Sequence, residues 1–292
     1  MREAKVSVCI FAFNLEKYIA KAIESVLMQR ANFHYEIIIG EDNSTDKTRN
    51  ICLSYQKSFP EKIKILLREE NLGMTRNVFD TLKEASGQYV AVLDGDDYWI
   101  DPLKLQKQVD FMDLNPDFSL CCHNSIILYE DHDIAPSLFN ARDQNDIIST
   151  EQLISKWSIS TASMLYRRSF MTFPEWIYGV HNFDLAIQLI VADKGRIKFL
   201  KDPMAVYRRT LISNSFNPKY SAEFVIRKQM EFFNTINEYY HNKYNYVIKR
   251  KLFQLGSNLR QTHFNNRFPF IKYLYPRKMY KMLGRFFNDP VI

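Results

Sequence analysis

The stretch Tyr89–Trp99, which reads YVAVLDGDDYW, decides the fold class. Its opening run of β-forming residues, bounded by glycines, has the length and composition of an interior strand of a parallel sheet. The strand pattern runs directly into Asp94, Asp96 and Asp97. In an extended chain Asp94 and Asp96 project to the same side. Two hard oxygen ligands side by side suit Mg²⁺ or Mn²⁺, with open positions for phosphate oxygens.

The same acids have a plainer interpretation as a polar turn, because turns are rich in Asp and Gly. Both interpretations stay open on this stretch alone, since so short a motif often occurs without a function. A calcium loop fits poorly. Counted from Asp94, its twelfth position is Leu105, where an EF-hand needs a bidentate Glu.

The composition is that of a folded protein with a sizeable core. The chain has 292 residues, of which 46% are hydrophobic and 25% charged. Its four Cys form no CxxC pair, which indicates core thiols of a reducing compartment rather than disulfides or a zinc site. No signal-peptide pattern is evident at residues 1–14, and no apolar run approaches the ~18 residues of a membrane span. We therefore expect a cytoplasmic protein.

The charge is distributed unevenly. The net charge is +6, yet residues 241–292 hold eleven Lys or Arg against one acid, which gives this segment +10 and leaves −4 for the rest. Tyr and Phe are interleaved with these cations. Such a segment suits the anionic inner face of a membrane, although a helical appendage with a solvated basic face explains it equally well. Nucleic acid is not an expected partner, because no recognition motif accompanies the charge.

Strand and helix patterns alternate through the first part of the chain. Apolar, β-branched runs predict strands at residues 5–11, 35–40, 63–67 and 89–93. Helical spacing predicts helices at 15–27 (capped by Asn14), around 51–55, and at 75–85. This alternation implies an α/β fold, with a mostly parallel sheet covered by helices on both faces. Ligands bind at the carboxyl ends of such strands, so residues 11–14, 41–46 and 94–97 should meet at one edge. A nucleotide bound beside so many acids would need a cation.

The remaining sequence is less regular. It predicts helices at 102–114, 150–157 and 184–192, strands at 118–129, 161–166, 197–200 and 205–208, and a loop at 130–145. We expect one catalytic domain over residues 1–215 and a basic, aromatic-rich helical extension over 216–292.

A series of motifs then appears in a familiar order. The sequence reads VSVCIFAFN at 6–14, GEDNSTDKT at 40–48, NLGMTRN at 71–77, VLDGDDYW at 92–99, HNFDLAIQL at 181–189 and AVYRR at 205–209. Together they resemble the motifs of the inverting, metal-dependent family 2 glycosyltransferases of the GT-A fold, over roughly residues 4–210. The first resembles that family's Pro-Thr-Tyr-Asn-type turn, the fourth its DxD strand end, and the fifth the acceptor-side motif in which an Asp opens a helix.

The resemblance implies a nucleotide-sugar site at the sheet edge. By analogy Phe13 would lie against the nucleobase, beside the backbone of Phe11 and Ala12. Asp42 would accept a hydrogen bond from the base, and Arg76 would contact the base or a phosphate. The DxD segment would supply Asp94 for ribose or metal, Gly95, and Asp96 for the Mn²⁺ or Mg²⁺ that bridges the diphosphate.

The resemblance also implies an acceptor side. Asp184 would be the general base for an acceptor hydroxyl, although an Asp at that position commonly caps its helix. Trp99, directly after the carboxylates, is the preferred residue for stacking on a sugar, whereas Trp176 suits the core. Asp46 is expected to cap a helix. His123 and His181 are expected to be hydrogen-bonded rather than metal ligands.

The implied reaction moves a sugar, most commonly from UDP, to a hydroxyl of a glycan or lipid-linked acceptor. Two departures from the family pattern bear on it. Phe11 and Ala12 replace Pro and Thr, and Thr210 stands where many members have a His that helps to hold metal or diphosphate, with Asp202, Arg208 and Arg209 as candidates to compensate. A catalytically degenerate binding or scaffold module and a nucleotidyltransferase are the alternatives. No Gly-rich phosphate loop supports the second.

Overall fold

The computed structural model describes residues 3–130, 133–210 and 221–267. Contacts divide the chain into two compact units. The first, called here the sheet unit, comprises Met1–Gly179 and Phe183–Leu211, and the second comprises Val180–Asn182 and Ile212–Ile292. The boundary expected at residue 215 lies outside the described residues.

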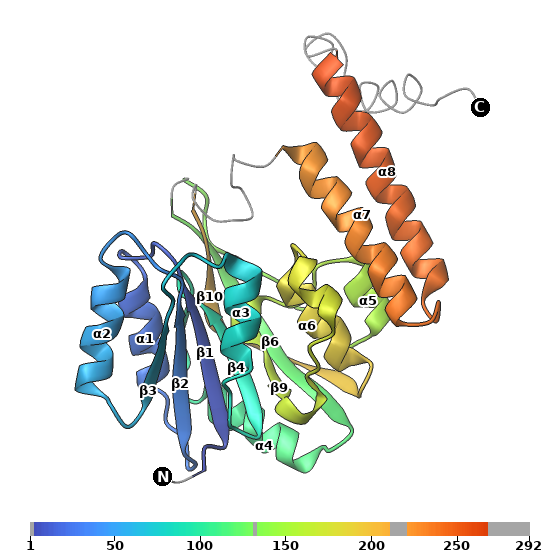
Figure 1. The fold of residues 1–292 in the computed structure, drawn as a ribbon. Helices are drawn as coiled ribbons and strands as arrows, with labels where there is room; N and C mark the ends of the chain where they lie inside the picture. The colour runs from blue at the N-terminus through green and yellow to red at the C-terminus, as the bar shows by residue number, and fades with distance from the viewer. Residues whose placement is uncertain (1–2, 131–132, 211–220, 268–292) are drawn as a thin grey trace. The chain divides into compact units, whose positions relative to one another are not determined.

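The sheet unit is built on a single mixed sheet whose first half is parallel (Figure 1). Strands β1, β2, β3 and β4 pair in parallel in the order β3-β2-β1-β4, as the alternating pattern predicts. The sheet then continues through β9, β6, β10 and β5, with β9 antiparallel to both of its neighbours. The strands are β1 (Val6–Ala12), β2 (Tyr35–Glu41), β3 (Ile63–Leu67), β4 (Tyr89–Asp94), β5 (Tyr98–Trp99), β6 (Phe118–Tyr129), β7 (Ser137–Leu138), β8 (Ile147–Ile148), β9 (Leu165–Arg167) and β10 (Arg196–Arg209).

Helices cover both faces of this sheet, with α1 and α2 on one side and α3 and α6 on the other (Figure 1). The face toward α1 buries alternate residues of β1, among them Val8 and Ile10, against Ile23 and Val26 of α1. The other face is covered as well, so the residues in between, Ser7, Cys9 and Phe11, are also buried and β1 is almost entirely apolar. The helices of the unit are α1 (Ile19–Leu27), α2 (Thr48–Ser58), α3 (Met74–Leu82), α4 (Lys104–Leu114), α5 (Thr150–Ser155) and α6 (Phe183–Ala192), with short 3-10 turns at Thr161–Ser163, Arg168–Phe170 and Glu175–Gly179.

Three local predictions need correction. The first helix begins at Ile19 and is not capped by Asn14, which instead adopts a left-handed φ of 54° in the turn after β1. The strand predicted at 161–166 opens as a 3-10 turn, so only Leu165–Arg167 pairs in the sheet. The two short strands predicted near the end are one strand, β10, because register irregularities between Leu200 and Ala205 carry it past Pro203 without ending it.

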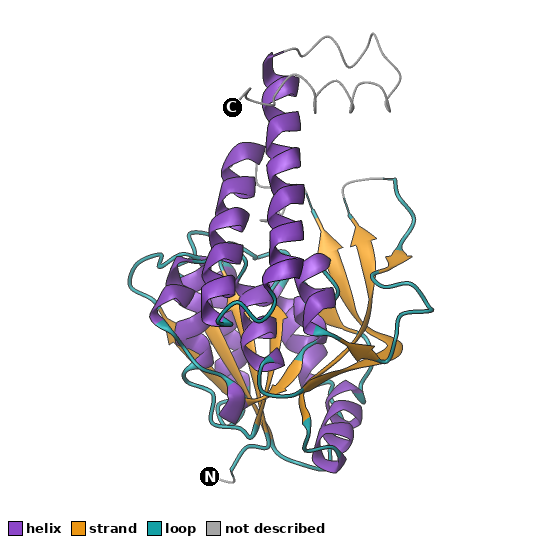
Figure 2. Cartoon of the chain, turned by 90° about the vertical axis from the view of Figure 1, so that its right-hand side faces the viewer, coloured by secondary structure: helices purple, strands orange, loops and turns teal. Residues whose placement is uncertain are grey.

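The second unit is a pair of helices, α7 (Ala222–Tyr239) and α8 (Asn245–Arg267), which run side by side in both views (Figures 1 and 2). This confirms a helical extension after the sheet unit. Phe232, Phe233 and Ile236 of α7 are buried, as are Ile248 and Leu255 of α8, and the short connection keeps the helices antiparallel. Within the described ranges, no helix combines the length and apolar character needed to cross a bilayer.

Candidate active site

The end of β4 presents its acids through a tight turn. Asp94 is the last residue of β4 and is half-buried, as is Asp96. The Gly95 N–H donates to the carbonyl oxygen of Phe11 at 2.9 Å, which ties the turn to β1. A Cβ at Gly95 would lie 2.7 Å from that oxygen, closer than real Cβ atoms come, so only glycine fits. The backbone between the two acids is therefore fixed by the neighbouring strand.

Four carboxylates, which we call the carboxylate cluster, gather at this strand end: Asp94, Asp96, Asp97 and Asp184. Burial raises the pKa of Asp94 to about 8, and the charges of Asp96 and Asp184 add to the shift. Burial also raises the pKa of Asp97 well above its ordinary value, with Asp96 and then Asp94 contributing. Burial likewise raises the pKa of Asp96 and of Asp184. The fold thus brings Asp184, from α6, into electrostatic contact with the DxD turn.

Arg208, near the end of β10, holds this turn in place. Its backbone N–H donates to Oδ1 of Asp97 at 2.8 Å, and its Nη1 donates to the backbone carbonyl of Asp96 at 2.9 Å. The guanidinium also lies 2.8 Å from a carboxylate oxygen of Glu130 and 4.5 Å from the ring centre of Tyr98. Arg208 is only 5% exposed, so it acts as a buried brace for the acids.

The carboxylates of Asp94 and Asp96 suit a small cation that is also held by oxygens of a substrate. In the part of the chain that the structure describes, no group of three or more His, Cys, Asp or Glu is arranged to hold a metal ion. Mg²⁺ and Mn²⁺ need fewer protein ligands, because water and phosphate oxygens complete their coordination. Asp94 and Asp96 are partly accessible and have raised pKa values, and a bound cation would relieve that repulsion. Asp202 is not one of the acids that could hold this cation, since it is exposed and its carboxylate lies 3.8 Å from the Lys107 ammonium.

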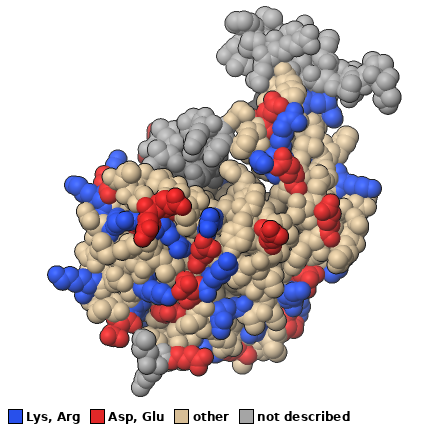
Figure 3. Space-filling view, in the orientation of Figure 1, with Lys and Arg blue, Asp and Glu red and all other residues tan. Residues whose placement is uncertain are grey.

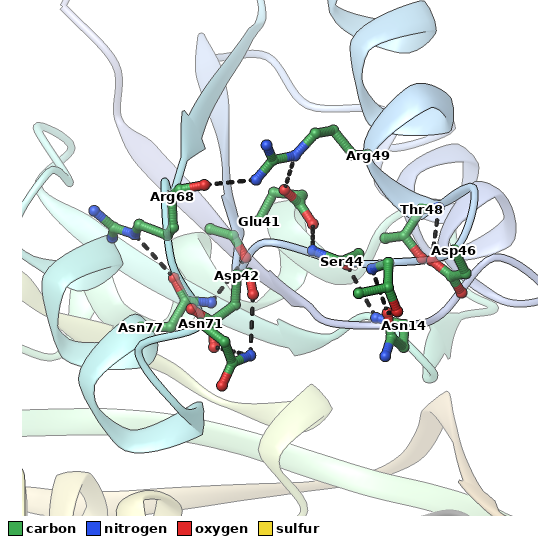
Figure 4. Close-up of polar contacts among 12 residues, drawn as sticks. Asn14, Glu41, Asp42, Ser44, Asp46, Thr48, Arg49, Arg68, Asn71 and Asn77 are labelled. Carbon is green, nitrogen blue, oxygen red and sulfur yellow. Dashed lines mark hydrogen bonds and ion pairs between the residues drawn. The ribbon is translucent and has the colours of Figure 1, made fainter.

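The loop after β2, residues 41–48, holds a second set of acids, which Figure 4 shows in a dense network of hydrogen bonds. We call it the β2 loop. Glu41 is fully buried and forms an ion pair with Arg49 at 2.5 Å, while its other oxygen accepts the Ser44 N–H at 2.7 Å. Asp46 accepts the N–H of Thr48 at 2.9 Å and that of Glu16 at 3.0 Å. Asp46 therefore anchors the start of α2, in line with its expected capping role.

Asp42 is also held by protein groups. One carboxylate oxygen accepts the Leu72 N–H at 2.8 Å, and the other accepts the Gly73 N–H at 3.0 Å and the side-chain amide of Asn71 at 3.1 Å (Figure 4). Burial raises its pKa, although these hydrogen bonds oppose the shift. Asp42 thereby fixes the loop that leads into α3, the helix that carries Arg76. Oδ2 accepts two of these bonds and Oδ1 only one, so a nucleobase donor would use the lone pair that remains on Oδ1.

The residues expected around the nucleotide differ in exposure. Phe11 and Ala12 are buried, and the Phe11 ring meets that of Phe183 edge-on at 6.0 Å, next to Asp184. Phe13 is 44% exposed, so its ring is available to a ligand. Arg76 lies in the first turn of α3, with its side chain exposed and its Nε 3.6 Å from Asp80. Both exposed side chains are free to contact a nucleotide, which stays a prediction.

Trp99 corrects the prediction for acceptor stacking. The residue is 1% exposed, its indole N–H donates to the carbonyl of Ala162 at 2.9 Å, and the ammonium of Lys104 lies 3.9 Å from the ring centre. The ring therefore belongs to the core and offers no free face to a sugar. It is buried because β5 pairs with β10 and covers it, a contact between distant segments that the local sequence does not reveal.

Trp157 is the aromatic residue that the sequence analysis missed. It is 42% exposed, and its side chain donates a hydrogen bond to the carboxylate of Asp184. Asp184 lies in the first turn of α6, where its carboxylate also accepts a bond from the backbone N–H of Leu185, and its charge acts on the cluster. Thr161 is a second missed residue, because its side chain bonds to Asp94. Neither Trp157 nor Thr161 belongs to a motif that could have marked it.

His123 and His181 both contact protein groups. His123 is 1% exposed, its Nδ1 lies 2.7 Å from the carbonyl of Asn124, and burial lowers its pKa well below the ordinary value. His181 meets the ring of Phe224 edge-on at 6.4 Å within the second unit. His123 is thus hydrogen-bonded to the protein, as the sequence predicts.

Comparison with known proteins identifies the class. The family model described as "Glycosyl transferase family 2" matches residues 7–172, more than half of the chain. The chain therefore belongs to glycosyltransferase family 2, whose members have the GT-A fold. An uncharacterized protein of Mycobacterium tuberculosis is 36% identical over 207 residues, which cover 70% of this chain and 58% of the relative. The chain thus spans less than two thirds of the length of this mycobacterial relative.

Other relatives carry more specific names. The UDP-Glc:alpha-D-GlcNAc-diphosphoundecaprenol beta-1,3-glucosyltransferase WfgD of Escherichia coli is 36% identical over 112 residues, or 38% of this chain and 42% of that protein. Among solved structures, TarS 1-349 of S. aureus in complex with UDP-GlcNAc superposes with a TM-score of 0.63 at 20% identity, covering 89% of this chain and 73% of that one. The mannosyltransferase PcManGT of Pyrobaculum calidifontis in complex with GDP-Man and Mn²⁺ has a TM-score of 0.57 at 13% identity and covers 97% and 84%. At these identities the structural matches establish the fold alone.

Proposed function

We propose that this family 2 glycosyltransferase is metal-dependent and inverting, and that it transfers a hexose or N-acetylhexosamine from a UDP-sugar to a hydroxyl of a glycan or lipid-linked acceptor in polysaccharide biosynthesis. The observation that carries the proposal is the electrostatic interaction of Asp184, on α6, with Asp94 of the DxD turn, which brings a candidate base near the acids that would face a diphosphate. The UDP and UDP-GlcNAc bound by TarS, and the UDP-Glc in the name of WfgD, support the choice of donor.

The reaction follows from this separation of roles. Asp184 takes the proton of the acceptor hydroxyl while the acceptor oxygen forms a bond to the anomeric carbon of the sugar. The bond between that carbon and the diphosphate oxygen breaks on the opposite face, which inverts the configuration, and the electron pair leaves with UDP. Asp94 and Asp96 would hold Mn²⁺ or Mg²⁺, which neutralises charge on the leaving diphosphate when bound. Arg208 keeps the backbone of Asp96 and the carboxylate of Asp97 in position for this.

Calorimetry with UDP, GDP, CDP and dTDP, each with and without Mn²⁺, tests the donor site. We expect UDP to bind only in the presence of Mn²⁺, and Asp96→Asn to weaken this binding at least about tenfold. Asp143→Asn, a change at an exposed loop acid, serves as the control and should bind UDP as the natural chain does. If no nucleotide binds under either condition, the protein is the binding or scaffold module considered above. Equal binding without metal would contradict the metal dependence.

The second unit supports a proposed location at the inner face of a membrane. Cations and acids are interspersed over the visible face of the sheet unit (Figure 3), whereas α8 contains five Lys or Arg and no Asp or Glu. Tyr246 and Phe253 of α8 are 82% and 74% exposed, and Lys249 and Arg250 are exposed between them. Exposed aromatic rings flanked by cations favour the interface of an anionic bilayer.

Vesicle flotation tests this location. The full chain should float with vesicles that contain phosphatidylglycerol and should not float with vesicles of phosphatidylcholine alone. Each cation near an anionic surface contributes about 1 kcal/mol to the binding free energy. The double variant Tyr246→Ser, Phe253→Ser should float at least severalfold less. Phe59→Ser, at an exposed ring on the sheet unit, should float normally. Equal flotation of all three proteins would remove α8 from the proposal.

A further inference from the structure

Three aromatic side chains from distant segments form a cluster beside Asp184: Phe139, Trp157 and Tyr207. The rings of Phe139 and Trp157 meet edge-on with centres 4.8 Å apart, and those of Trp157 and Tyr207 with centres 5.5 Å apart. Phe139 and Tyr207 close the triangle at 6.1 Å. Edge-to-face contacts at these distances are favourable, so each ring helps to fix the orientation of the other two.

The indole of Trp157 is both fixed and exposed. Phe139 and Tyr207 are half-buried, whereas Trp157 is 42% exposed. The indole N–H is committed to the Asp184 carboxylate, so the exposed part of the ring offers a ligand apolar aromatic surface and not a free polar edge. A single exposed aromatic residue needs no explanation. One that is held by two ring contacts and by a hydrogen bond to the proposed base differs from an ordinary surface residue.

We propose that Trp157 forms the acceptor subsite, where its indole stacks on the apolar face of a pyranose ring and presents a hydroxyl of that sugar to Asp184. This rests on the proposed function, in which Asp184 is the base, and it narrows the acceptor. A pyranose carries a face of C–H groups that matches the flat indole, and a rigid aromatic contact costs little conformational entropy. A linear alditol phosphate and a simple lipid alcohol both lack such a face. The acceptor is therefore a cyclic sugar, whether free in a glycan or linked to a lipid.

Glycan binding by the full chain tests the subsite. The protein, with Mn²⁺ and UDP present, is applied to an array of pyranose oligosaccharides, and the dissociation constant of the best ligand is then measured by calorimetry. We expect Trp157→Ala to weaken binding about tenfold or more, and Trp157→Phe, which keeps a flat ring, to stay within about threefold of the natural chain. Phe59→Ala is the matched control, because Phe59 is also 42% exposed and lies at the end of α2.

The Phe variant separates stacking from a structural role. Loss of the indole N–H removes the bond to Asp184 in both variants, so a purely structural residue would give equal losses, whereas stacking gives a loss in the Ala variant alone. Equal affinity of Trp157→Ala and the natural chain, equal losses in the two variants, or no pyranose ligand on the array would each overturn the subsite. UDP binding is measured in the same samples. If UDP binds normally while the subsite fails, only this inference falls, and if UDP does not bind, the proposed function falls instead.

Discussion

The β2 loop and the carboxylate cluster hold the same kinds of side chain at neighbouring strand ends, yet they differ in how those side chains are satisfied. In the β2 loop, Glu41 and Asp46 accept hydrogen bonds or ion pairs on both oxygens, and these bonds lower the pKa of Asp46. In the carboxylate cluster, the acids face one another and burial raises their pKa values. Oδ2 of Asp97 is buried without a hydrogen-bond partner among the described residues.

The difference separates residues that maintain the fold from residues that await a ligand. Acids with complete sets of donors stabilise the native state by their own contacts. Acids that are held close together and partly buried destabilise the native state until a cation or a substrate binds. Such local destabilisation is typical of functional sites. Substitutions in the two regions should therefore have opposite effects on stability, and only those in the carboxylate cluster should reduce transfer strongly.

The largest effect is expected for Asp184→Asn. An amide cannot accept the proton of the acceptor hydroxyl, so the rate of transfer should fall about 10²–10⁴-fold. UDP binding by calorimetry should stay unchanged, because the base acts on the acceptor side. Asp193→Asn, an exposed acid just beyond the other end of α6, is the matched control and should transfer normally. Full transfer activity in Asp184→Asn would show that another group is the base.

Asp46→Ala should destabilise the protein by about 1–2 kcal/mol, because two backbone N–H groups lose their acceptor. The pKa of Asp46 is lowered in the folded state, so its contribution is present above the unfolded pKa, near 3.9, and is lost as the pH falls through the folded value. Urea unfolding at pH 7 and pH 3 should thus show a smaller difference between the two proteins at pH 3. An equal difference at both values would mean that the carboxylate charge is not what stabilises the loop.

Asp94→Asn should change the free energy of unfolding in the opposite direction and by less. We expect it to stabilise the metal-free protein by about 1 kcal/mol at pH 8. The folded-state pKa of Asp94 is raised to about 8, so the folded protein binds more protons than the unfolded chain between pH 4 and 8. The contribution of Asp94 to the stability of the natural chain therefore decreases as the pH rises over that range. Urea unfolding in EDTA should show the advantage of Asn growing from pH 5 to pH 8. If Asp94→Asn were less stable than the natural chain at pH 8, Asp94 would stabilise the fold as the acids of the β2 loop do.

The parts that the sequence could predict are those set by local pattern. The four parallel strands, their carboxyl-end acids and the helix opened by Asp184 follow from periodicity and from motif order. The rest depends on pairing between distant segments. Trp99 is buried because β5 pairs with β10, and Trp157 reaches Asp184 only because α5 and α6 pack together. The bulged course of β10 past Pro203 is likewise set by its partner β6, which no local window contains.

The brace formed by Arg208 also has a consequence for the order of folding. Its hydrogen bond to Asp97 joins residues that are 111 positions apart, whereas β1 to β4 pair within the first third of the chain. During synthesis the parallel half can assemble while β10 is still missing, since contacts close in sequence form first. The DxD turn would then be tied to β1 through Gly95 but would lack its hydrogen bonds to Arg208 until that residue is made. A ribosome-bound chain stopped before β10 should accordingly be compact and resistant to protease, yet unable to hold nucleotide.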